Sequence, residues 1–258
     1  MSLRHFPNLR ILALQIAPLV AFVLFWELSV HGNPSLKFFF GSPIDILRDL
    51  GRRFADGSLV RDTAVTFSEA ILGFALGNLL GTLSGLALWF SRTAMRIARP
   101  YVIFLGAAPI FAFAPLLVIW FGTGLFSKVM ISTLSTLFIA LTQAYSGASE
   151  VSEEHIRLMK TLGANQTETF RKVVVPSSLV WVISAFKLNI GFALLGAFIG
   201  EFISSNQGLG HLILVATGLF DISLVLSGVF LLCALAFVLN FLVARSEPIL
   251  RQLVVRYL

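Results

Sequence analysis

Long runs without a charged residue divide this sequence and limit the folds that the chain can adopt. Four such runs cover residues 70–91, 100–127, 129–149 and 222–244. A helix crosses a membrane with about 20 consecutive apolar residues. Only 12% of the residues are charged and 57% are hydrophobic, whereas about 25% are charged in a typical soluble domain. The sequence therefore predicts an all-α integral membrane protein.

We interpret the apolar runs as six membrane-spanning helices within a single domain over residues 1–258. The predicted spans are residues 11–31, 65–91, 100–122, 127–147, 176–203 and 222–246. The first run is long for a signal peptide and no small-residue cleavage site follows it, so we expect it to be retained. Residues 204–221 hold too few apolar positions for another span, and we expect them at the membrane surface.

The distribution of Lys and Arg predicts the orientation of these helices. With six spans and the N-terminus inside, residues 1–10, 92–99, 147–175 and 245–258 face the cytoplasm and carry 12 basic residues. The outer loops carry six, and Lys187 lies within a predicted helix. Because cytoplasmic loops are enriched in Lys and Arg, we predict that both termini are cytoplasmic.

One polar segment, residues 147–176, separates two apolar runs and carries eight charged residues. Gly163 predicts a left-handed helix end, and Asn165 with Glu168 has the form of a capping box. We therefore predict two short helices joined at Gly163, with Pro176 starting the next membrane helix. Val151, Leu158, Met159 and Leu162 give the first of these helices an apolar side, and Phe170 and Val173 give the second an apolar contact. A solvated loop explains the charge but not these features together, so we favour a docking element for a cytoplasmic partner.

Glycine recurs at every fourth position of the second run. These residues are Gly73, Gly77, Gly81 and Gly85. Such a stripe lets the backbone of another helix approach closely in a membrane. It predicts tight packing within the subunit, which we favour, or packing against a second subunit.

The third run is interrupted by Pro109 and Pro115, with Phe113 between them. Proline kinks a helix, and a membrane tolerates this where neighbouring groups or a water-filled cavity satisfy the freed carbonyls. The run is therefore a candidate lining for a transport path, with a merely kinked structural helix as the alternative.

Lys187 is the charged residue placed deepest in a predicted span. Such a charge is costly and usually faces a cavity or a partner. Lys187 either lines a path and attracts an anionic or polar substrate, or it pairs with a buried acid or a helix-end carbonyl. Glu201 lies roughly 21 Å farther along the same helix, too far to pair with it, and we expect Glu201 to be hydrated near the outer surface.

The sequence holds no catalytic set. It lacks the glycine-rich loop that binds ATP phosphates, so we expect neither ATP binding nor any other cofactor in this chain. The four histidines are scattered over different loops, and Cys233 is the one cysteine, so we expect no metal site. The net charge of +6 comes without a basic, aromatic-rich patch, and nucleic-acid binding is not expected.

Two motifs resemble ABC-importer permeases. Gly163, followed by Val173, Val175 and Pro176, is similar to the G-x9-I-x-L-P half of their coupling motif. PIFAFAPL at 109–116 and WFGTG at 120–124 resemble the P-x-x-A-x-x-P-L…W-F-G-x-G signature of the nitrate/sulfonate/taurine branch. Further similarities are Gly41-Ser42-Pro43, Glu201 and Gly208-Leu209-Gly210. Arg157-Leu158-Met159 replaces the usual Glu-Ala-Ala, Phe113 stands where many relatives carry Trp, and Gly106 replaces a basic residue.

The resemblance implies the transmembrane subunit of an ATP-driven importer with the type I permease fold, in a bacterial inner membrane. It implies a homodimer with two cytoplasmic ATPase subunits, which bind ATP and Mg²⁺, and a periplasmic binding protein. The solute would be a nitrate-, sulfonate- or taurine-like anion or a small aromatic or heterocyclic compound. The implied ATPase-coupling residues are Glu154, Arg157, Leu158, Leu162, Gly163, Ala164, Phe170, Val173 and Pro176. The candidate path residues are Pro109, Phe113, Pro115, Lys187 and Glu201.

Two other classes of protein compete with this interpretation. A stand-alone secondary transporter or channel predicts inverted repeats and paired intramembrane carboxylates, and the sequence displays neither. A membrane-embedded enzyme would need a catalytic set, which is also missing.

Overall fold

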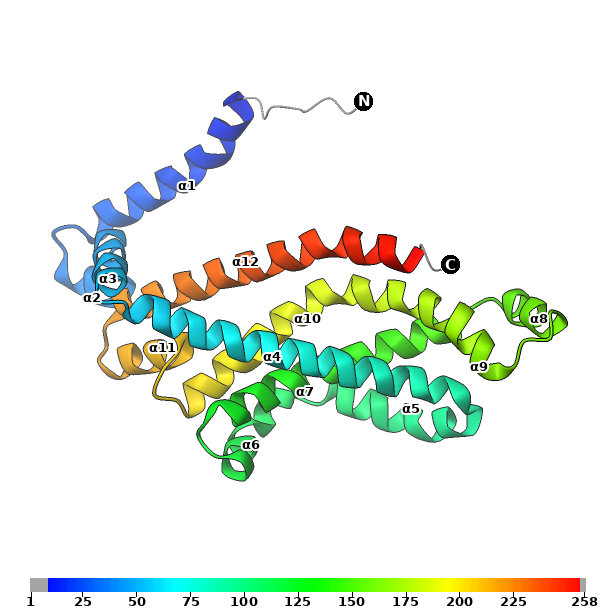
Figure 1. The fold of residues 1–258 in the computed structure, drawn as a ribbon. Coiled ribbons are helices and arrows are strands. Elements are labelled where there is room, and N and C mark those ends of the chain that lie inside the picture. The colour runs from blue at the N-terminus through cyan, green and yellow to red at the C-terminus, as the bar shows by residue number, and fades with distance from the viewer. Residues whose placement is uncertain (1–8, 256–258) are drawn as a thin grey trace. The chain divides into compact units, whose positions relative to one another are not determined.

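The computed structural model describes residues 9–255, and within this range the chain is built from helices joined by short turns (Figure 1). Two compact units are described separately. The first contains residues up to Val60 together with Leu212–Phe230, and the second contains Arg61–His211 and the chain from Leu231 onward.

The first unit contains α1 (Leu9–Val30), α2 (Pro34–Phe40) and α3 (Pro43–Ala55), most of α11 (Leu209–Gly218) and the start of α12 (Ile222–Val255). Both short helices begin with a capped first turn. Asn33 and Ser42 accept hydrogen bonds from backbone N–H groups of the first turn, and a proline follows each of them. Proline suits this position because its missing N–H has no partner in the first helical turn.

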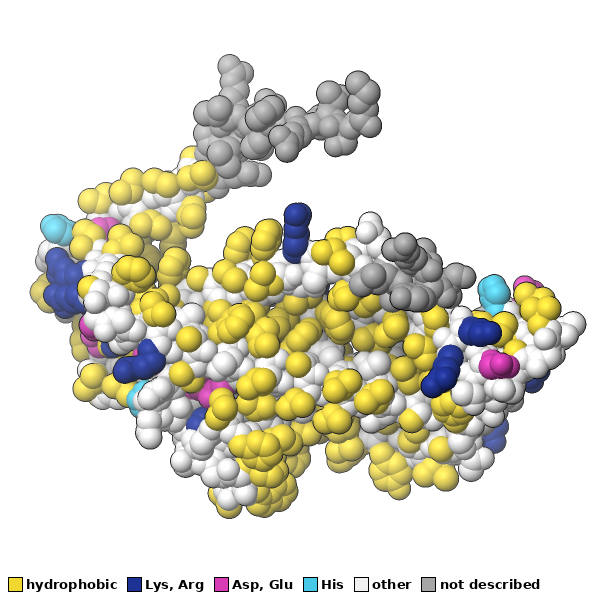
Figure 2. Space-filling view, in the orientation of Figure 1, with side chains coloured by type: hydrophobic (Ala, Val, Ile, Leu, Met, Phe, Trp, Pro, Cys, Tyr) yellow, Lys and Arg dark blue, Asp and Glu magenta, His cyan; other side chains and the backbone are white. Residues whose placement is uncertain are grey.

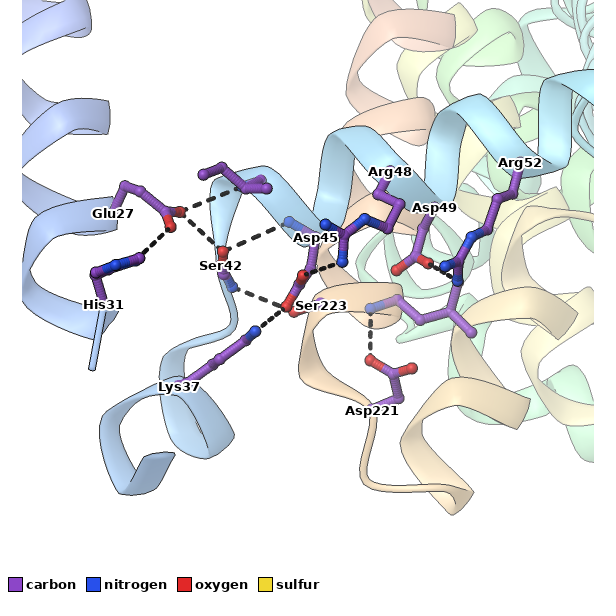
Figure 3. Close-up of polar contacts among 12 residues, drawn as sticks. Glu27, His31, Lys37, Ser42, Asp45, Arg48, Asp49, Arg52, Asp221 and Ser223 are labelled. Atoms are coloured by element: carbon purple, nitrogen blue, oxygen red, sulfur yellow. Dashed lines mark hydrogen bonds and ion pairs between the residues drawn. The ribbon is translucent and has the colours of Figure 1, made fainter. Parts of the chain in front are cut away.

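Ser42 joins three segments of the first unit (Figure 3). Its hydroxyl donates to Glu27 Oε2 at 2.8 Å, and its backbone N–H donates to the hydroxyl of Ser223 at 3.2 Å. Gly41 has a φ of +67°, and a Cβ there would lie 3.0 Å from Leu226 Cδ1. The Gly41-Ser42-Pro43 motif therefore fixes the start of α3 against α1 and α12.

Asp49 lies on α3 in the same part of the molecule (Figure 3). Partial burial, and then the nearby Asp221 carboxylate, raise the pKa of Asp49 above its usual value. Arg52 Nη1 lies 3.9 Å from Asp49 Oδ1 and opposes that shift.

The second unit is arranged around the packed pair α7 (Leu125–Ser149) and α10 (Val175–Ile203). Most of α4 (Ser58–Ala87) belongs to it, as do α5 (Arg92–Ala107), α6 (Ala114–Phe121), α8 (Glu153–Thr161) and α9 (Gln166–Thr169). Short 3₁₀ turns cover Leu88–Phe90 and Ile110–Phe113. Apolar side chains cover most of its visible surface, whereas charged ones gather around α8 (Figure 2).

The glycine stripe of α4 packs against α7. A Cβ at Gly77 would lie 1.9 Å from Thr136 Oγ1, and one at Gly81 would lie 2.3 Å from the Leu137 carbonyl oxygen. Gly73 and Gly85 face Ser132 and the Leu141 carbonyl in the same way. The stripe therefore serves packing within the subunit, the alternative that the sequence favoured.

Within the described residues, four helical stretches are long and apolar enough to cross a membrane, or five if the bent α5–α6 pair is one span. The stretches are Ser58–Phe90, Leu125–Ser149, Gln166–Ile203 and Ile222–Gln252. The first predicted span falls on α1, whose apolar part Ile16–Val30 is shorter. All-helical architecture is confirmed, while the six-span count and the orientation stay predictions. Residues 209–218 form the short helix α11.

Candidate functional site

The polar segment begins with α8, whose first turn is well capped. Ser152 accepts a hydrogen bond from the Glu154 N–H at 3.2 Å. Glu153 and Glu154 lie in the first turn and Lys160 in the last, so the charges complement the helix dipole. Arg157 Nη2 bonds to Glu153 Oε2 at 3.0 Å, and both side chains are exposed. Arg157, which replaces an acid of the coupling motif, therefore lies on the surface of α8.

Gly163 ends α8 as predicted. Its φ is +79°, and a Cβ there would meet nothing within 4 Å, so backbone conformation alone favours glycine. The Ala164 N–H donates to the Met159 carbonyl at 2.9 Å, and the Gly163 N–H donates to that of Lys160 at 3.0 Å. This pair of bonds is a Schellman motif, which turns the chain sharply after α8.

Asn165 starts the next helix with the predicted capping box. The Glu168 N–H donates to Asn165 Oδ1, and the Asn165 N–H donates to Glu168 Oε2, each at 2.9 Å. The prediction of a separate second short helix is wrong, because α9 continues through the π turn Phe170–Val174 into α10. Pro176 has no N–H and its ring crowds the preceding turn. Widening that turn to a π turn, with the Val175 N–H bonded to the Phe170 carbonyl, accommodates the proline without breaking the helix.

One side of the polar segment is anchored to the rest of the second unit. The ring of Phe170 lies 5.5 Å from that of Trp89 and 4.4 Å from that of Phe90. Phe170 and Val151 pack on a buried cluster from the ends of α4 and α7, the π turn and the first part of α10. Its members are Leu86, Ala144, Ala148, Val174 and Val182. The contact of Phe170 with Trp89 and Phe90 was not predicted, although an aromatic pair just before a basic loop was a signal for it.

The opposite side of the segment presents two leucines. Leu158 is 56% exposed and Leu162 is 72% exposed, one helical turn apart. Val173 and Met159 are only partly exposed. We call α8 with its Gly163 turn the docking helix, after the docking role that the sequence predicts for this segment.

The candidate path residues around the prolines lie at a sharp break. The helices on either side, Thr93–Gly106 and Ile110–Phe121, are bent by 79°. Pro109 precedes the 3₁₀ turn and Pro115 lies in the first turn of α6. Phe113 is 48% exposed. The predicted interruption at Pro109 is therefore present, whereas a second one at Pro115 is not, because Ile110–Phe121 is continuous and Pro115 lies in the first turn of α6. The role of this break in a path stays a prediction.

Lys187 pairs with an acid from another helix. Its Nζ lies 2.7 Å from Glu247 Oε2 of α12. Arg251 donates from Nε to Glu247 Oε1 at 3.0 Å and from Nη2 to Ser184 Oγ at 2.6 Å. Lys187 therefore pairs with an acid, as one of the two alternatives has it, but the Glu247 side chain is only partly buried and that of Lys187 is 53% exposed. The partner was not predicted from the sequence. Glu247, the first acid after the last apolar run, was the available signal.

Glu201 is completely buried, so the prediction that water hydrates it is wrong. Thr66 Oγ1 donates to Glu201 Oε1 at 2.7 Å, and the Gly210 N–H donates to Oε2 at 2.7 Å. A Cβ at Gly208 would lie 2.2 Å from Oε1, so the glycine lets the chain close over the carboxyl group. Protein donors thus replace water around Glu201.

The structure does not bring the predicted site residues into one site. Glu201 lies with Thr66 and Gly210, Lys187 lies with Glu247 and Arg251, and the docking helix forms a third location. Among the described residues, no cluster of three His, Cys, Asp or Glu side chains could hold a metal ion.

Comparison with known proteins decides among the classes of transporter. Residues 77–252 match the family described as binding-protein-dependent transport system inner membrane component. The chain belongs to this family. It is the permease subunit of an ABC importer, a multi-pass inner-membrane transport component and not an enzyme. Its similarities place it in the nitrate/sulfonate/taurine branch.

Three curated permeases illustrate the range of relatives. A probable ABC transporter permease protein of Haemophilus influenzae is 30% identical, and the match covers 85% of this chain and 89% of the relative. The riboflavin transport system permease protein RibX of Chloroflexus aurantiacus is 29% identical, with 90% and 87% covered. The taurine transport system permease protein TauC of Escherichia coli is 27% identical, with 72% and 68% covered.

A solved structure supports the permease fold. A chain of the MetNI methionine ABC transporter, in an inward-facing conformation, matches with a TM-score of 0.66 at 18% identity. The match covers 76% of this permease and 97% of that chain. The likeness shows the fold, which is that of a type I importer permease.

Proposed function

We propose that this permease works as a homodimer with two cytoplasmic ATPase subunits and a periplasmic binding protein. Each subunit would cross the lipid membrane six times with both termini in the cytoplasm. The family description, which makes transport dependent on a binding protein, supports the partner set. The excess of basic residues in the predicted inner loops supports the orientation.

The docking helix would seat in a groove of the ATPase subunit, which binds ATP and Mg²⁺, while this chain binds no cofactor. The observation that carries this proposal is the pair Leu158 and Leu162, exposed on a segment whose other side is anchored through Phe170. Burial of two leucines against a partner would contribute about 1.5–3 kcal/mol each. Arg157, exposed on the same helix, would contact a groove adapted to a basic residue.

The continuous helix beyond the Gly163 turn would transmit a displacement of the docking helix to the membrane-spanning part of the permease. Residues Gln166–Ile203 form one helical stretch of 38 residues, and its α10 part packs along α7. A displacement of the docking helix on ATPase closure would therefore tilt this stretch. We propose that the tilt alternates access to a path near the α5–α6 break and Lys187.

The transported solute would be a nitrate-, sulfonate- or taurine-like anion, or a small aromatic or heterocyclic compound. The relatives named for taurine and for riboflavin support these two possibilities.

Replacement of Gly163 by valine tests the docking role. A non-glycine residue at this φ costs about 1–2 kcal/mol, and we expect the strain to displace the docking helix. Transport in proteoliposomes containing the whole complex should fall by roughly 5–30-fold, while basal ATP hydrolysis persists. Gly57→Val is the matched control, because Gly57 has a φ of +77° and also has nothing within 4 Å of a Cβ.

Two outcomes would contradict the proposed function. Unchanged coupling of ATP hydrolysis to transport in Gly163→Val would remove the docking role. Solute uptake by the permease reconstituted without an ATPase subunit would favour a stand-alone transporter.

A further inference from the structure

A cavity of about 650 Å³ lies between α5 and α7, apart from the docking helix and the Lys187 pair. Its volume is in the range of small-molecule sites. The α5 wall includes Arg99, Val102 and Gly106. The α7 wall includes Phe138, Thr142 and Gln143. The cavity thus combines an apolar body with a few polar groups, which is typical of ligand sites.

Arg99 is the one charged side chain in the wall of this cavity. Among the described residues, no carboxylate forms an ion pair or a hydrogen bond with it. A guanidinium is always charged and presents several donors that match a carboxylate or sulfonate. Arg99 is exposed, so its guanidinium, which has no carboxylate partner among the described residues, is available to an anionic occupant beside the apolar walls.

The α7 wall supplies neutral polar groups. The Thr142 hydroxyl donates to the Phe138 carbonyl at 2.8 Å, so it offers an occupant only acceptor lone pairs, and the side-chain amide of Gln143 supplies the N–H donors that an anion would use. The wall contains no acidic side chain, so nothing in it would balance a cation. The cavity therefore suits a ligand that carries one negative charge and is otherwise uncharged.

Gly106 leaves room for the uncharged part of such a ligand. It lies seven residues, or two helical turns, from Arg99 and therefore on the same face of α5. A Cβ at Gly106 would approach only the Cβ of Phe138, at 4.0 Å. A large side chain at Gly106 would occupy the cavity, whereas the glycine leaves space beside the Phe138 ring.

We propose that the α5–α7 cavity binds a small organic monoanion, a sulfonate or carboxylate on an apolar or aromatic body, with Arg99 as its charge partner. The proposal rests on the proposed function and chooses among its substrates: the transported solute is an organic anion that passes through this cavity. Arg99 then determines specificity for charge, and Gly106 determines the size of the accepted body.

Calorimetry on the purified full-length permease tests the charge role with naphthalene-2-sulfonate and its neutral analogue naphthalene-2-sulfonamide. Arg99→Gln should weaken sulfonate binding by roughly tenfold or more, because it removes a charge-assisted hydrogen bond, and should leave sulfonamide binding unchanged. Arg96→Gln is the matched control, an exposed arginine of α5 outside the cavity wall, and should bind both probes like the unmodified protein. Equal sulfonate affinity in Arg99→Gln and Arg96→Gln would overturn the proposal.

Gly106→Phe tests the cavity itself. The substitution should abolish binding of both probes. The number of permease chains in each detergent-solubilised complex, measured by light scattering, should stay the same. If Gly106→Phe dissociates the permease chains from one another, the cavity is filled by a helix of a second chain and the proposal fails.

Transport measurements separate this proposal from the proposed function. If Arg99→Gln retains the ATPase subunit and transports naphthalene-2-sulfonate at the unmodified rate, the cavity proposal fails and the importer function stands. If sulfonate binding depends on Arg99 but no ATPase subunit associates with the permease, the importer assembly fails and the cavity proposal stands.

Discussion

At the scale of single residues, Glu201 shows how an apolar helix accommodates a carboxyl group. Thr66 donates to Glu201 Oε1 at 2.7 Å and accepts the Leu209 N–H at 2.9 Å. Asp62 Oδ1 accepts the Gly208 N–H at 3.2 Å. The Thr66 hydroxyl therefore holds both the acid and the start of α11, with no water needed at either group.

Removal of this hydroxyl should destabilise the permease. Thr66→Val leaves a buried acceptor and a buried donor unpaired, which costs about 1–3 kcal/mol each. We expect a lower midpoint of thermal unfolding in detergent. Thr66→Ser keeps the hydroxyl and serves as the control, with a smaller loss from the missing methyl group. Equal midpoints for the valine and serine variants would show that the hydroxyl contributes no net stability.

At the scale of helices, the glycine stripe sets the distance between α4 and α7. Gly81→Ala places a Cβ 2.3 Å from the Leu137 carbonyl oxygen, and backbone has to move. Overpacking of this kind costs about 1–3 kcal/mol, so we expect faster proteolysis and a lower unfolding midpoint.

Gly191→Ala is the matched control for the stripe. Gly191 lies within α10, and a Cβ there would meet nothing within 4 Å. Alanine should stabilise that helix by up to about 1 kcal/mol through helix propensity. If Gly81→Ala and Gly191→Ala have the same midpoint of thermal unfolding, then α4 and α7 do not pack as closely as the structure shows.

Local sequence patterns predicted the elements well because their causes are local. Glycine spacing, the Gly163 helix end and the Asn165–Glu168 capping box depend on neighbours within one or two turns, and all were found as expected. Glu247 as the partner of Lys187 and Thr66 as a partner of Glu201 were missed, since they lie 60 and 135 positions away along the chain. The π turn before Pro176 was missed because either a break or a wider turn accommodates the proline ring.

At the scale of the whole molecule, the orientation of the spans can be tested by labelling. With Cys233 replaced by alanine, Asn206→Cys should react with a membrane-impermeant maleimide in intact cells, because residues 204–221 are predicted outside. Glu154→Cys, on the docking helix, should react only after the membrane is opened. Both side chains replaced are exposed, so burial in the subunit does not explain a difference. Labelling of Glu154→Cys in intact cells would reverse the predicted topology.

The number of permease copies follows from the number of docking helices. Each chain carries one polar segment with exposed apolar residues, Leu158 and Leu162, so two ATPase subunits require two permeases. When copies with two different tags are expressed together with the ATPase subunit, one tag should retrieve the other. The double variant Leu158→Ser with Leu162→Ser should lose the ATPase subunit yet keep the second copy, because neither leucine lies in a membrane helix through which two copies would associate in the proposed homodimer. If a tag retrieves the ATPase subunit but never a second copy, the importer pairs this chain with a different permease, and the homodimer is wrong.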